Sequence, residues 1–421
     1  MRQIRTLKKL DATVRVPGSK SYTQRALIIA SLAEGKSLLR HALISDDTNH
    51  LMEALRSLGA GILVADTDIA ATGTGGNIQN PGKKLFLGNN GTALRFLTTL
   101  ASLGTGEVTL DGSDRLRKRP LQPLLDALKG LGVACRGTGN NGCPPVVIQG
   151  GGLRGGKAVF TDARSSQYIS SLLISAPYAK KDVAVRLRGS TASLPYIDMT
   201  TGVMGHFCVD VTKGGAGEYI VRAPQRYTGQ EYLIEGDVSS ASYFFLAAAL
   251  CKGTVRVLNI NPDTLQGDIG LLEIMEQLGC RVLRGQDWVE VTGDTLHTGD
   301  CRFDMAHMPD MVPTLAVLSA FRPGRTVIGN VLHLRLKESD RTEALVNELN
   351  RTGIDAEERE DGLVINGGTP HGARIETYDD HRIAMSFAVA GLAAEGMEIK
   401  NEGCVSKSFP DFWEELERLY P

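Results

Sequence analysis

The segment S-S-A-S-Y-F-F-L-A-A-A-L, residues 239–250, decides how the fold is interpreted. It is apolar on nearly every face after a small polar start, and a helix that is apolar all round lies buried inside a domain. Segments of this kind begin near Ser21, Gly91, Ser165, Ser239, Met311 and His381. Their starts are separated by 70, 74, 74, 72 and 70 residues. The pattern therefore predicts six repeats of about seventy residues.

A second helix series alternates with the first, and its members are amphipathic. The copies read L-M-E-A-L-R-S-L-G (51–59), L-L-D-A-L-K-G-L-G (124–132), L-L-E-I-M-E-Q-L-G (271–279) and L-V-N-E-L-N-R-T-G (345–353). A glycine after the last periodic residue is the usual helix stop. We expect Gly205, midway between Gly132 and Gly279, to mark a degenerate copy. The C-terminal W-E-E-L-E-R-L-Y is interpreted as a truncated one.

Short β-rich pieces fill the space between these helices, such as A-T-V-R-V (12–16) and A-V-F-T-D (158–162). Each repeat then runs strand, buried helix, strand, amphipathic helix and strands. This order predicts an α/β protein in which every repeat is one α/β unit. A length of 421 residues is enough for two or three domains.

The composition excludes several classes of partner. Lys plus Arg (46) nearly balances Asp plus Glu (48), and aromatic residues make up 5 %, so a nucleic-acid partner is not expected. The seven cysteines contain no C-x-x-C pair, which predicts reduced thiols and no metal site. No apolar run of membrane length and no secretory signal occur, so we expect a cytoplasmic protein without a membrane partner.

Small polar loops precede the buried helices. A helix N-terminus favours anions through its unpaired N–H groups and dipole, although Ser, Asn and Asp there also serve as ordinary caps. Cations at Lys20, Arg95, Arg164 and Arg382 favour the first interpretation, as do the basic clusters 115–120 and 334–341. A P-loop, G-x-G-x-x-G after a strand, H-E-x-x-H and G-x-S-x-G are all absent from the sequence. The pattern fits a cleft for compact polyanions.

These motifs resemble one family, the 5-enolpyruvylshikimate-3-phosphate synthases. The matching strings follow one order over essentially the whole chain: P-G-S-K-S-Y-T-Q-R-A-L (17–27), L-G-N-N-G-T-A-L-R (87–95), K-R-P (118–120), S-S-Q (165–167), P-Y-I-D (195–198), P-D (309–310), K-E-S-D-R (337–341), D-D-H-R-I-A-M (379–385) and K-S-F-P-D (407–411). Several of these strings are specific alone, and the set is very specific.

The resemblance implies two similar domains, each of three βαβαββ units with buried parallel helices, an inside-out α/β barrel. It places residues 1–18 plus 229–421 in the first domain and 19–228 in the second, with two crossover strands near 18 and 229 as a hinge. The expected reaction joins phosphoenolpyruvate to the 5-hydroxyl of shikimate 3-phosphate and releases phosphate, by addition and elimination without a cofactor. The family is the target of glyphosate. We expect a monomer whose domains close when ligands neutralise mutually repelling cations.

The resemblance also assigns roles by position. Asp310 is expected to be the base, and Glu338 with Lys20 the proton-transfer groups. The phosphoenolpyruvate set is Lys20, Gly91, Thr92, Arg119, Gln167, Arg341, Arg382 and Lys407. The shikimate 3-phosphate set is Lys20, Ser21, Arg25, Ser165, Ser166, Gln167, Ser193, Tyr196, Asp310, His333 and Lys337.

Two positions depart from the family pattern. His333 stands where the best-known members have Asn, so the charge of an imidazole would enter a substrate contact. Phe96 follows Arg95 where many members have Pro, which leaves the buried helix free to be straighter. Both positions put glyphosate sensitivity in doubt.

Two alternatives stay open. The sister transferase that acts on UDP-N-acetylglucosamine carries a reactive Cys in the loop before its Arg-Pro, whereas residues 111–120 contain none and the nearest is Cys135. A non-catalytic anion-binding protein would explain the basic loops but not the carboxylates Asp310 and Glu338.

Overall fold

The chain divides into two compact units. A computed structural model describes residues 1–215 and 217–420, and it separates unit 1 (Met1–Pro17 and Glu235–Pro421) from unit 2 (Gly18–Ile234). These boundaries lie one and six residues from the positions that the resemblance implied. The later boundary is displaced because strand β14 (Glu231–Leu233) pairs with β3 (Lys36–Arg40) and so belongs to unit 2.

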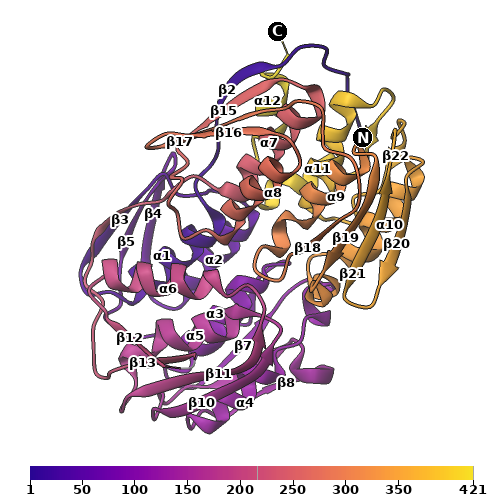
Figure 1. Ribbon diagram of the computed structural model, residues 1–421. Coiled ribbons are helices and arrows are strands. Elements are labelled where there is room, and N and C mark those ends of the chain that lie inside the picture. Colours follow the sequence, from indigo (N-terminus) through magenta and orange to yellow (C-terminus); the bar gives the residue numbers. More distant parts are fainter. Residues whose placement is uncertain (216, 421) are drawn as a thin grey trace. The chain divides into compact units, whose positions relative to one another are not determined.

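Unit 2 contains three four-stranded sheets of one design (Figure 1). In each sheet a parallel pair is followed by two antiparallel pairings, as in the order β10-β11-β13-β12. The remaining strands are β4 (Gly61–Ala65), β5 (Asp68–Thr72), β6 (Leu85–Phe86), β7 (Glu107–Asp111), β8 (Cys135–Gly137), β9 (Val146–Gln149), β10 (Gly156–Ala163), β11 (Val183–Thr191), β12 (Val211–Gly214) and β13 (Glu218–Val221).

Unit 1 contains two four-stranded sheets with the same strand order as those of unit 2, and a third sheet that is smaller. Its third sheet has three strands, in which β1 takes an outer place beside β23. The strands are β1 (Arg2–Gln3), β2 (Asp11–Arg15), β15 (Thr254–Leu258), β16 (Arg281–Arg284), β17 (Trp288–Thr292), β18 (Cys301–Asp304), β19 (Gly324–Gly329), β20 (Asp355–Arg359), β21 (Gly362–Gly367), β22 (Arg374–Ile375) and β23 (Glu398–Ile399). Strand β2 completes one sheet of unit 1, as β14 completes one sheet of unit 2.

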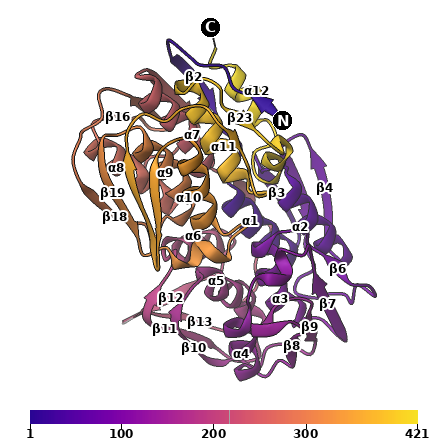
Figure 2. The same ribbon diagram turned by 90° about the vertical axis from the view of Figure 1, so that its right-hand side faces the viewer.

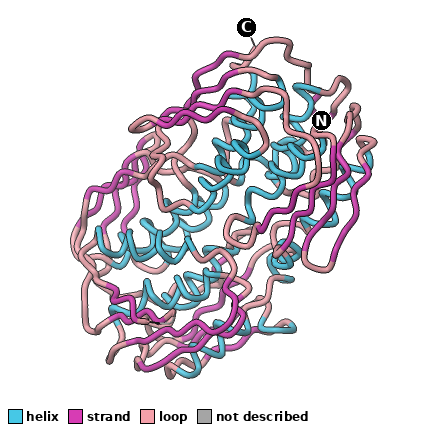
Figure 3. The backbone as a smooth tube through the Cα atoms, viewed as in Figure 1, coloured by secondary structure: helices cyan, strands magenta, loops and turns pink. Residues whose placement is uncertain are grey.

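The all-apolar segments form the buried helices of each unit. They are α1 (Lys20–Leu32), α3 (Gly91–Ala101), α5 (Ser166–Ser175), α7 (Val238–Cys251), α9 (Val312–Ala320) and α11 (His381–Ala393), each beginning within one residue of the expected start. Figure 3 shows the strands of each unit on the outside of its helices. In Figure 2, α7, α9 and α11 lie side by side, and each contacts the other two. Burial on every side explains why these helices carry no polar stripe.

Small hydroxyl side chains link neighbouring buried helices at repeated places. The Oγ1 of Thr99 and the Oγ of Ser171 lie 2.5 Å apart between α3 and α5. In unit 1, the corresponding pair Ser242 and Thr314 joins α7 to α9 at 3.0 Å. Both pairs are 72 residues apart in sequence, which is one repeat. The hydroxyls satisfy each other where water is excluded, so close helix packing costs no unpaired polar group.

The amphipathic helices are α2 (Asp46–Ser57), α4 (Gln122–Gly130), α8 (Leu271–Gln277) and α10 (Arg341–Arg351), together with α6 (Pro195–His206) and the short α12 (Phe412–Glu417). Gly59, Gly132, Gly279 and Gly353 end the first four with φ between 81° and 105°. Gly205 does not end α6, because it lies inside that helix. Cys208 takes the left-handed position instead, with φ 67°. Among the described residues, no helix is long and apolar enough to cross a membrane.

Candidate active site

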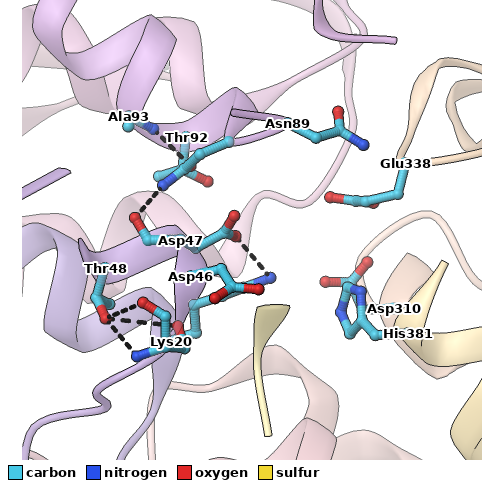
Figure 4. A network of polar contacts seen from close by, with 12 residues as sticks. Lys20, Asp46, Asp47, Thr48, Asn89, Thr92, Ala93, Asp310, Glu338 and His381 are labelled. Carbon is cyan, nitrogen blue, oxygen red and sulfur yellow. Dashed lines mark hydrogen bonds and ion pairs between the residues drawn. The ribbon is translucent and has the colours of Figure 1, made fainter. Parts of the chain in front are cut away.

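Lys20 begins helix α1 and lies beside a carboxylate of the neighbouring helix. Its Nζ is 3.5 Å from Asp47 Oδ2, and Asp47 is buried in the first turn of α2. Asn90 connects this pair to α3, since its Nδ2 donates to the Asp47 carbonyl at 2.7 Å and its Oδ1 caps Ala93 N. Figure 4 shows Lys20, Asp47 and Ala93 in this network. The starts of three helices are thus held together around Lys20.

Arg25 is a fully buried cation whose partners carry no formal charge. Its guanidinium donates to Thr200 Oγ1 and to the carbonyls of Ser21 and Tyr196. It also lies over the rings of Phe96, 5.4 Å from the ring centroid, and Tyr196, at 5.7 Å. Burial lowers the pKa of Arg25 to about 10, so it stays charged at neutral pH. A buried cation without a carboxylate among these partners suits an anionic ligand.

Gly91 and Arg119 share one space at the start of α3. A Cβ on Gly91 would stand 2.5 Å from Arg119 Cζ and 2.7 Å from each terminal nitrogen. The guanidinium therefore occupies the place that any side chain at 91 would need. Arg119 Nη1 also donates to the carbonyl of Asn89 at 3.4 Å. The glycine is required for the position of the arginine and not only for the helix start.

The amide of Gln167 is oriented from both sides. Arg95 Nη1 donates to its Oε1 at 2.6 Å, and its Nε2 donates to Thr92 Oγ1 at 2.9 Å. The donors fix which side of the amide carries the oxygen. Arg95 is buried and acts through Gln167, which explains a cation beside a helix start that the sequence left without a role.

The expected serines lie at the ends of the same helices. Ser165 caps α5 by accepting from Gln167 N at 3.3 Å, and Ser166 is the first residue of that helix. Ser193, with φ 58°, and Tyr196 lie at the start of α6. In the basic cluster 115–120, Arg117 is neutralised by buried Asp111, to which it donates twice at 2.9 Å.

In unit 1 the expected base, Asp310, lies among three cations. It is in the 3₁₀ helix η5 (Pro309–Met311), 2.8 Å from Arg341 Nη1, 2.8 Å from Arg382 Nη2 and 3.5 Å from Lys337 Nζ. Burial by itself raises the pKa of Asp310, but these charges hold it well below the ordinary value. Asp310 is therefore a carboxylate at neutral pH.

Arg341 links Asp310 to two more carboxylates. It is the first residue of α10 and donates to Glu338 Oε2 at 2.7 Å and to Asp380 Oδ2 at 2.8 Å. Asp380 in turn caps α11 and accepts from Ser339 Oγ at 2.9 Å. In Figure 4, Asp310 and Glu338 of this cluster are labelled. Lys337, Arg341 and Arg382 are thus already paired with acids, which the basic pattern of the sequence did not suggest.

The remaining residues expected in unit 1 flank this cluster. His333, in η6 (Leu332–Leu336), is buried, and burial with the nearby charge of Lys337 lowers its pKa to about 3. It is therefore a neutral imidazole. Lys407 is the last residue of η7 (Glu402–Lys407) and is also buried.

Three supporting residues had no assigned role in the sequence: Asp47, Asn90 and Asp380. Asp380 stood in the D-D-H-R string, so its place before a buried helix was the available signal. Asn90 held the same place before α3, in the L-G-N-N-G-T-A-L-R string, whereas Asp47 had no such signal. Among residues 1–215 and 217–420, no group of three or more His, Cys, Asp or Glu side chains fits a metal ion.

The comparisons with known proteins agree along the whole chain. Residues 4–416 match the family model of EPSP synthase (3-phosphoshikimate 1-carboxyvinyltransferase). The 3-phosphoshikimate 1-carboxyvinyltransferase of Syntrophobacter fumaroxidans is 43 % identical over 421 residues, which is 99 % of each chain. That of Methanoregula boonei is 42 % identical over 411 residues, 97 % of each chain.

A solved structure extends the agreement to the fold. EPSP synthase from Acinetobacter baumannii is 28 % identical, with a TM-score of 0.81 over 99 % of this chain and 97 % of that one. The α/β fold class expected from the repeats is thereby confirmed. By sequence over nearly its whole length and by structure, the chain belongs to the EPSP synthase (3-phosphoshikimate 1-carboxyvinyltransferase) family.

Proposed function

We propose that this chain is a transferase that moves the enolpyruvyl group of phosphoenolpyruvate to the 5-hydroxyl of shikimate 3-phosphate and releases phosphate. The observation that carries the proposal is the charge-balanced cluster of Asp310, Arg341 and Arg382 in a chain of this family. It supplies a carboxylate for proton transfer and cations for substrate anions within one unit.

Asp310 takes the proton of the 5-hydroxyl as that oxygen attacks the substituted carbon of phosphoenolpyruvate. In the free protein the neighbouring charges make Asp310 a weak base. Substrate phosphate and carboxylate groups then attract Arg382, Arg341 and Lys337. This interaction weakens the hold of those cations on Asp310 and raises its pKa toward that of an effective base.

Glu338 and Lys20 handle the other proton. One of them protonates the methylene carbon during addition, which gives a tetrahedral adduct with a methyl group. In the elimination step the carbon–oxygen bond to phosphate breaks and the methyl group loses one proton, so the enol ether forms again. Neighbouring cations stabilise the departing phosphate, and this electrostatic contribution is usually the largest in such reactions.

The remaining assignments are those that the resemblance to the family implies by position, and the chemistry of the side chains is consistent with them. Arg25, Ser165, Ser166, Ser193, Tyr196, His333 and Lys337 bind shikimate 3-phosphate, together with Lys20, Ser21, Gln167 and Asp310. Gly91, Thr92, Arg119, Gln167, Lys407, Arg341 and Arg382 bind phosphoenolpyruvate with Lys20. The reaction requires no metal, the enzyme acts as a monomer, and the segments near 18 and 229 form the hinge between its domains.

Phosphate release tests the proposed reaction. The purified chain is incubated with phosphoenolpyruvate and either shikimate 3-phosphate, UDP-N-acetylglucosamine or no acceptor, with and without a chelator. We expect release only with shikimate 3-phosphate, and no effect of the chelator. Release with UDP-N-acetylglucosamine at the same rate would identify the sister activity, and no release with any acceptor would leave an anion-binding protein.

A further inference from the structure

Asp268 is a buried carboxylate for which the reaction above has no role. It lies in the 3₁₀ helix η4 (Gly267–Gly270), just before α8, and its side chain is 3 % exposed. A buried carboxylate is costly unless it accepts hydrogen bonds or meets a cation. Its surroundings therefore indicate what it does.

A chain of hydrogen bonds leads from Asp268 to the proposed base. The Ser239 hydroxyl, at the start of α7, donates to Asp268 Oδ2. Arg382 Nη2 donates to the oxygen of that hydroxyl at 3.3 Å and to Asp310 Oδ2 at 2.8 Å. Asp268 and Asp310 are thus joined through one serine and one arginine nitrogen.

The direction of this chain depends on Asp268. A serine hydroxyl has one hydrogen and two lone pairs, and the carboxylate takes the hydrogen. The lone pairs are then left to accept from Arg382. Without an acceptor at 268, the hydroxyl is free to rotate its hydrogen toward the arginine, and the Ser239–Arg382 contact becomes unfavourable.

Arg382 has few other contacts that fix its orientation. Its Nη1 lies 3.4 Å from the Tyr243 hydroxyl, which is a long hydrogen bond. Its buried Nε has no hydrogen-bond partner in the described part of the chain. The Ser239 contact is therefore one of the few that hold the guanidinium in place against Asp310.

The charged groups around Asp268 come from three elements. Asp310 lies on η5, Asp237 caps α7 and Arg382 lies on α11. Burial and the charge of Asp310 raise the pKa of Asp268 to about 6, against the opposing effect of Arg382. The acceptor is therefore anionic at neutral pH and becomes protonated in mild acid.

We propose that Asp268 is a positioning residue for enolpyruvyl transfer, which acts through Ser239 to hold the Arg382 guanidinium on Asp310. This inference rests on the proposed function. Asp268 is not among the residues proposed to contact a substrate. Its substitution should therefore lower kcat more than it weakens the binding of shikimate 3-phosphate. Protonation of Asp268 reverses the hydrogen bond to Ser239 and loosens Arg382, which lowers turnover below about pH 6.

The test compares Asp268→Ala, Asp268→Asn and Ser239→Ala with wild type. Glu273→Gln is the matched control, since it removes one acidic charge from an exposed site on the adjacent α8. We measure kcat and both KM values by phosphate release between pH 5 and pH 8. Asp268→Ala and Ser239→Ala should each lower kcat by roughly 10- to 100-fold, as expected for a lost charged hydrogen bond. The KM for shikimate 3-phosphate should stay within about twofold of wild type.

Two further results distinguish positioning from general damage. Asp268→Asn is neutral like the protonated acid, so its kcat at pH 7 should match that of wild type in mild acid, and the fall in activity near pH 6 should be absent. The double variant Asp268→Ala/Ser239→Ala should be no slower than either single variant, because both break one chain. Ser239→Ala carries the test if Asp268→Ala fails to fold.

Three outcomes would overturn the inference alone while wild type is active. The first is that Asp268→Ala and Ser239→Ala have the same kcat as Glu273→Gln. The second is that the fold-losses in kcat of the two single variants multiply in the double variant. The third is that kcat of Asp268→Asn still falls below about pH 6. An inactive wild type would overturn the proposed function and the inference with it.

Discussion

Two fully buried arginines, one in each unit, are held in different ways. In unit 2, Arg25 contacts a hydroxyl, two carbonyls and two aromatic rings. In unit 1, Arg341 contacts the carboxylates of Asp310, Glu338 and Asp380. The first environment leaves a positive charge for a ligand to neutralise, whereas the second is already balanced. The comparison supports the proposal that Arg25 meets a substrate anion and that Asp310, beside Arg341, transfers a proton.

This difference corrects one expectation drawn from the sequence. The basic loops suggested an empty site in which cations repel one another and so keep the domains open. For Arg341 and Arg382 that account is wrong, because each lies 2.8 Å from Asp310. Closure of the domains on substrate binding stays a prediction, but in unit 1 it needs a cause other than repulsion between bare cations.

The largest expected effect is on the free energy of unfolding, and it appears when Arg341→Met is compared with Arg25→Met. Arg341→Met would leave three carboxylates without their shared cation and should lower the free energy of unfolding by about 3–5 kcal/mol. Arg25→Met replaces a buried charge that has no acid among its contacts, so it should change that free energy by less than about 1 kcal/mol. Urea unfolding at pH 7 measures both. Equal losses in the two variants would remove the distinction between the units.

The next effect concerns Gly91. Gly91→Ala should displace the Arg119 guanidinium, whose Cζ lies 2.5 Å from the position of the new methyl group. Because a flexible side chain yields, stability should hardly change, while phosphoenolpyruvate binding weakens by about 1–3 kcal/mol. Steady-state kinetics should give a raised KM for phosphoenolpyruvate and an unchanged KM for shikimate 3-phosphate. Arg119→Ala is the control, and adding Gly91→Ala to it should have little further effect. Independent losses would mean that the glycine matters for another reason.

A smaller effect concerns His333 and Asp268, two buried groups of unit 1 that should change the free energy of unfolding with pH in opposite directions. His333 has a folded pKa of about 3 against 6.5, so it releases its proton on folding and stability falls as pH drops from 6.5 toward 3. Asp268 has a folded pKa of about 6 against 3.8, so stability rises as pH drops from 6 toward 3.8. In wild type the two contributions oppose each other between about pH 4 and pH 6.

Single substitutions should reveal each contribution. Relative to wild type, His333→Asn should become more stable on acidification from pH 6 to pH 4, and Asp268→Asn less stable. Each slope is at most about 1.4 kcal/mol per pH unit, the value for one proton. Urea unfolding at pH 4, 5 and 6 measures the slopes. Parallel curves for all three proteins would show that neither group titrates as its surroundings indicate.

The smallest effect concerns the end of α6. Cys208 adopts φ 67° at the position where four other amphipathic helices have glycine. A residue with a Cβ is strained there by about 1 kcal/mol. Cys208→Gly should therefore raise the free energy of unfolding by up to about 1 kcal/mol, measured in urea, with no change in kcat. Gly205→Ala, inside α6, serves as a helix-propensity control. A destabilised Cys208→Gly protein would mean that the thiol contributes more than the strain costs.

The repeats and the buried helices could be predicted because their signals are local. Six apolar segments and their spacing located every buried helix to within one residue, and four glycines located helix ends. Gly205 was misleading because it was chosen as a helix end only from its spacing to Gly132 and Gly279. The left-handed residue lies instead where α6 ends, at Cys208. The backbone decides that position, and a cysteine tolerates it at a modest cost.

The site was predictable only where the family motifs reach. Asp310 and Arg341 stand in such strings. That they neutralise each other depends on a hydrogen bond between residues 31 positions apart in the sequence. Asp268 lies in an ordinary Q-G-D-I stretch, and its link to Arg382 spans two further elements. Long-range hydrogen bonds of this kind leave no local pattern, so sequence reasoning named Asp310 and Glu338 but did not predict that they pair with the arginines.

Equilibrium binding of shikimate 3-phosphate to Arg25→Met and Asp310→Asn tests the central claim most directly. Calorimetry at pH 7 would follow the same ligand with wild type as reference. If Arg25 meets an anionic group of shikimate 3-phosphate, Arg25→Met should lose about 2–4 kcal/mol of binding free energy, as expected for a lost charge partner. Asp310→Asn keeps an oxygen that can accept a hydrogen bond from the 5-hydroxyl, so its affinity should stay near that of wild type, while its kcat falls by roughly 10²- to 10⁴-fold because the amide is not a base. Normal binding by Arg25→Met together with normal turnover by Asp310→Asn would contradict the assignment of anion binding to Arg25 and of proton transfer to Asp310.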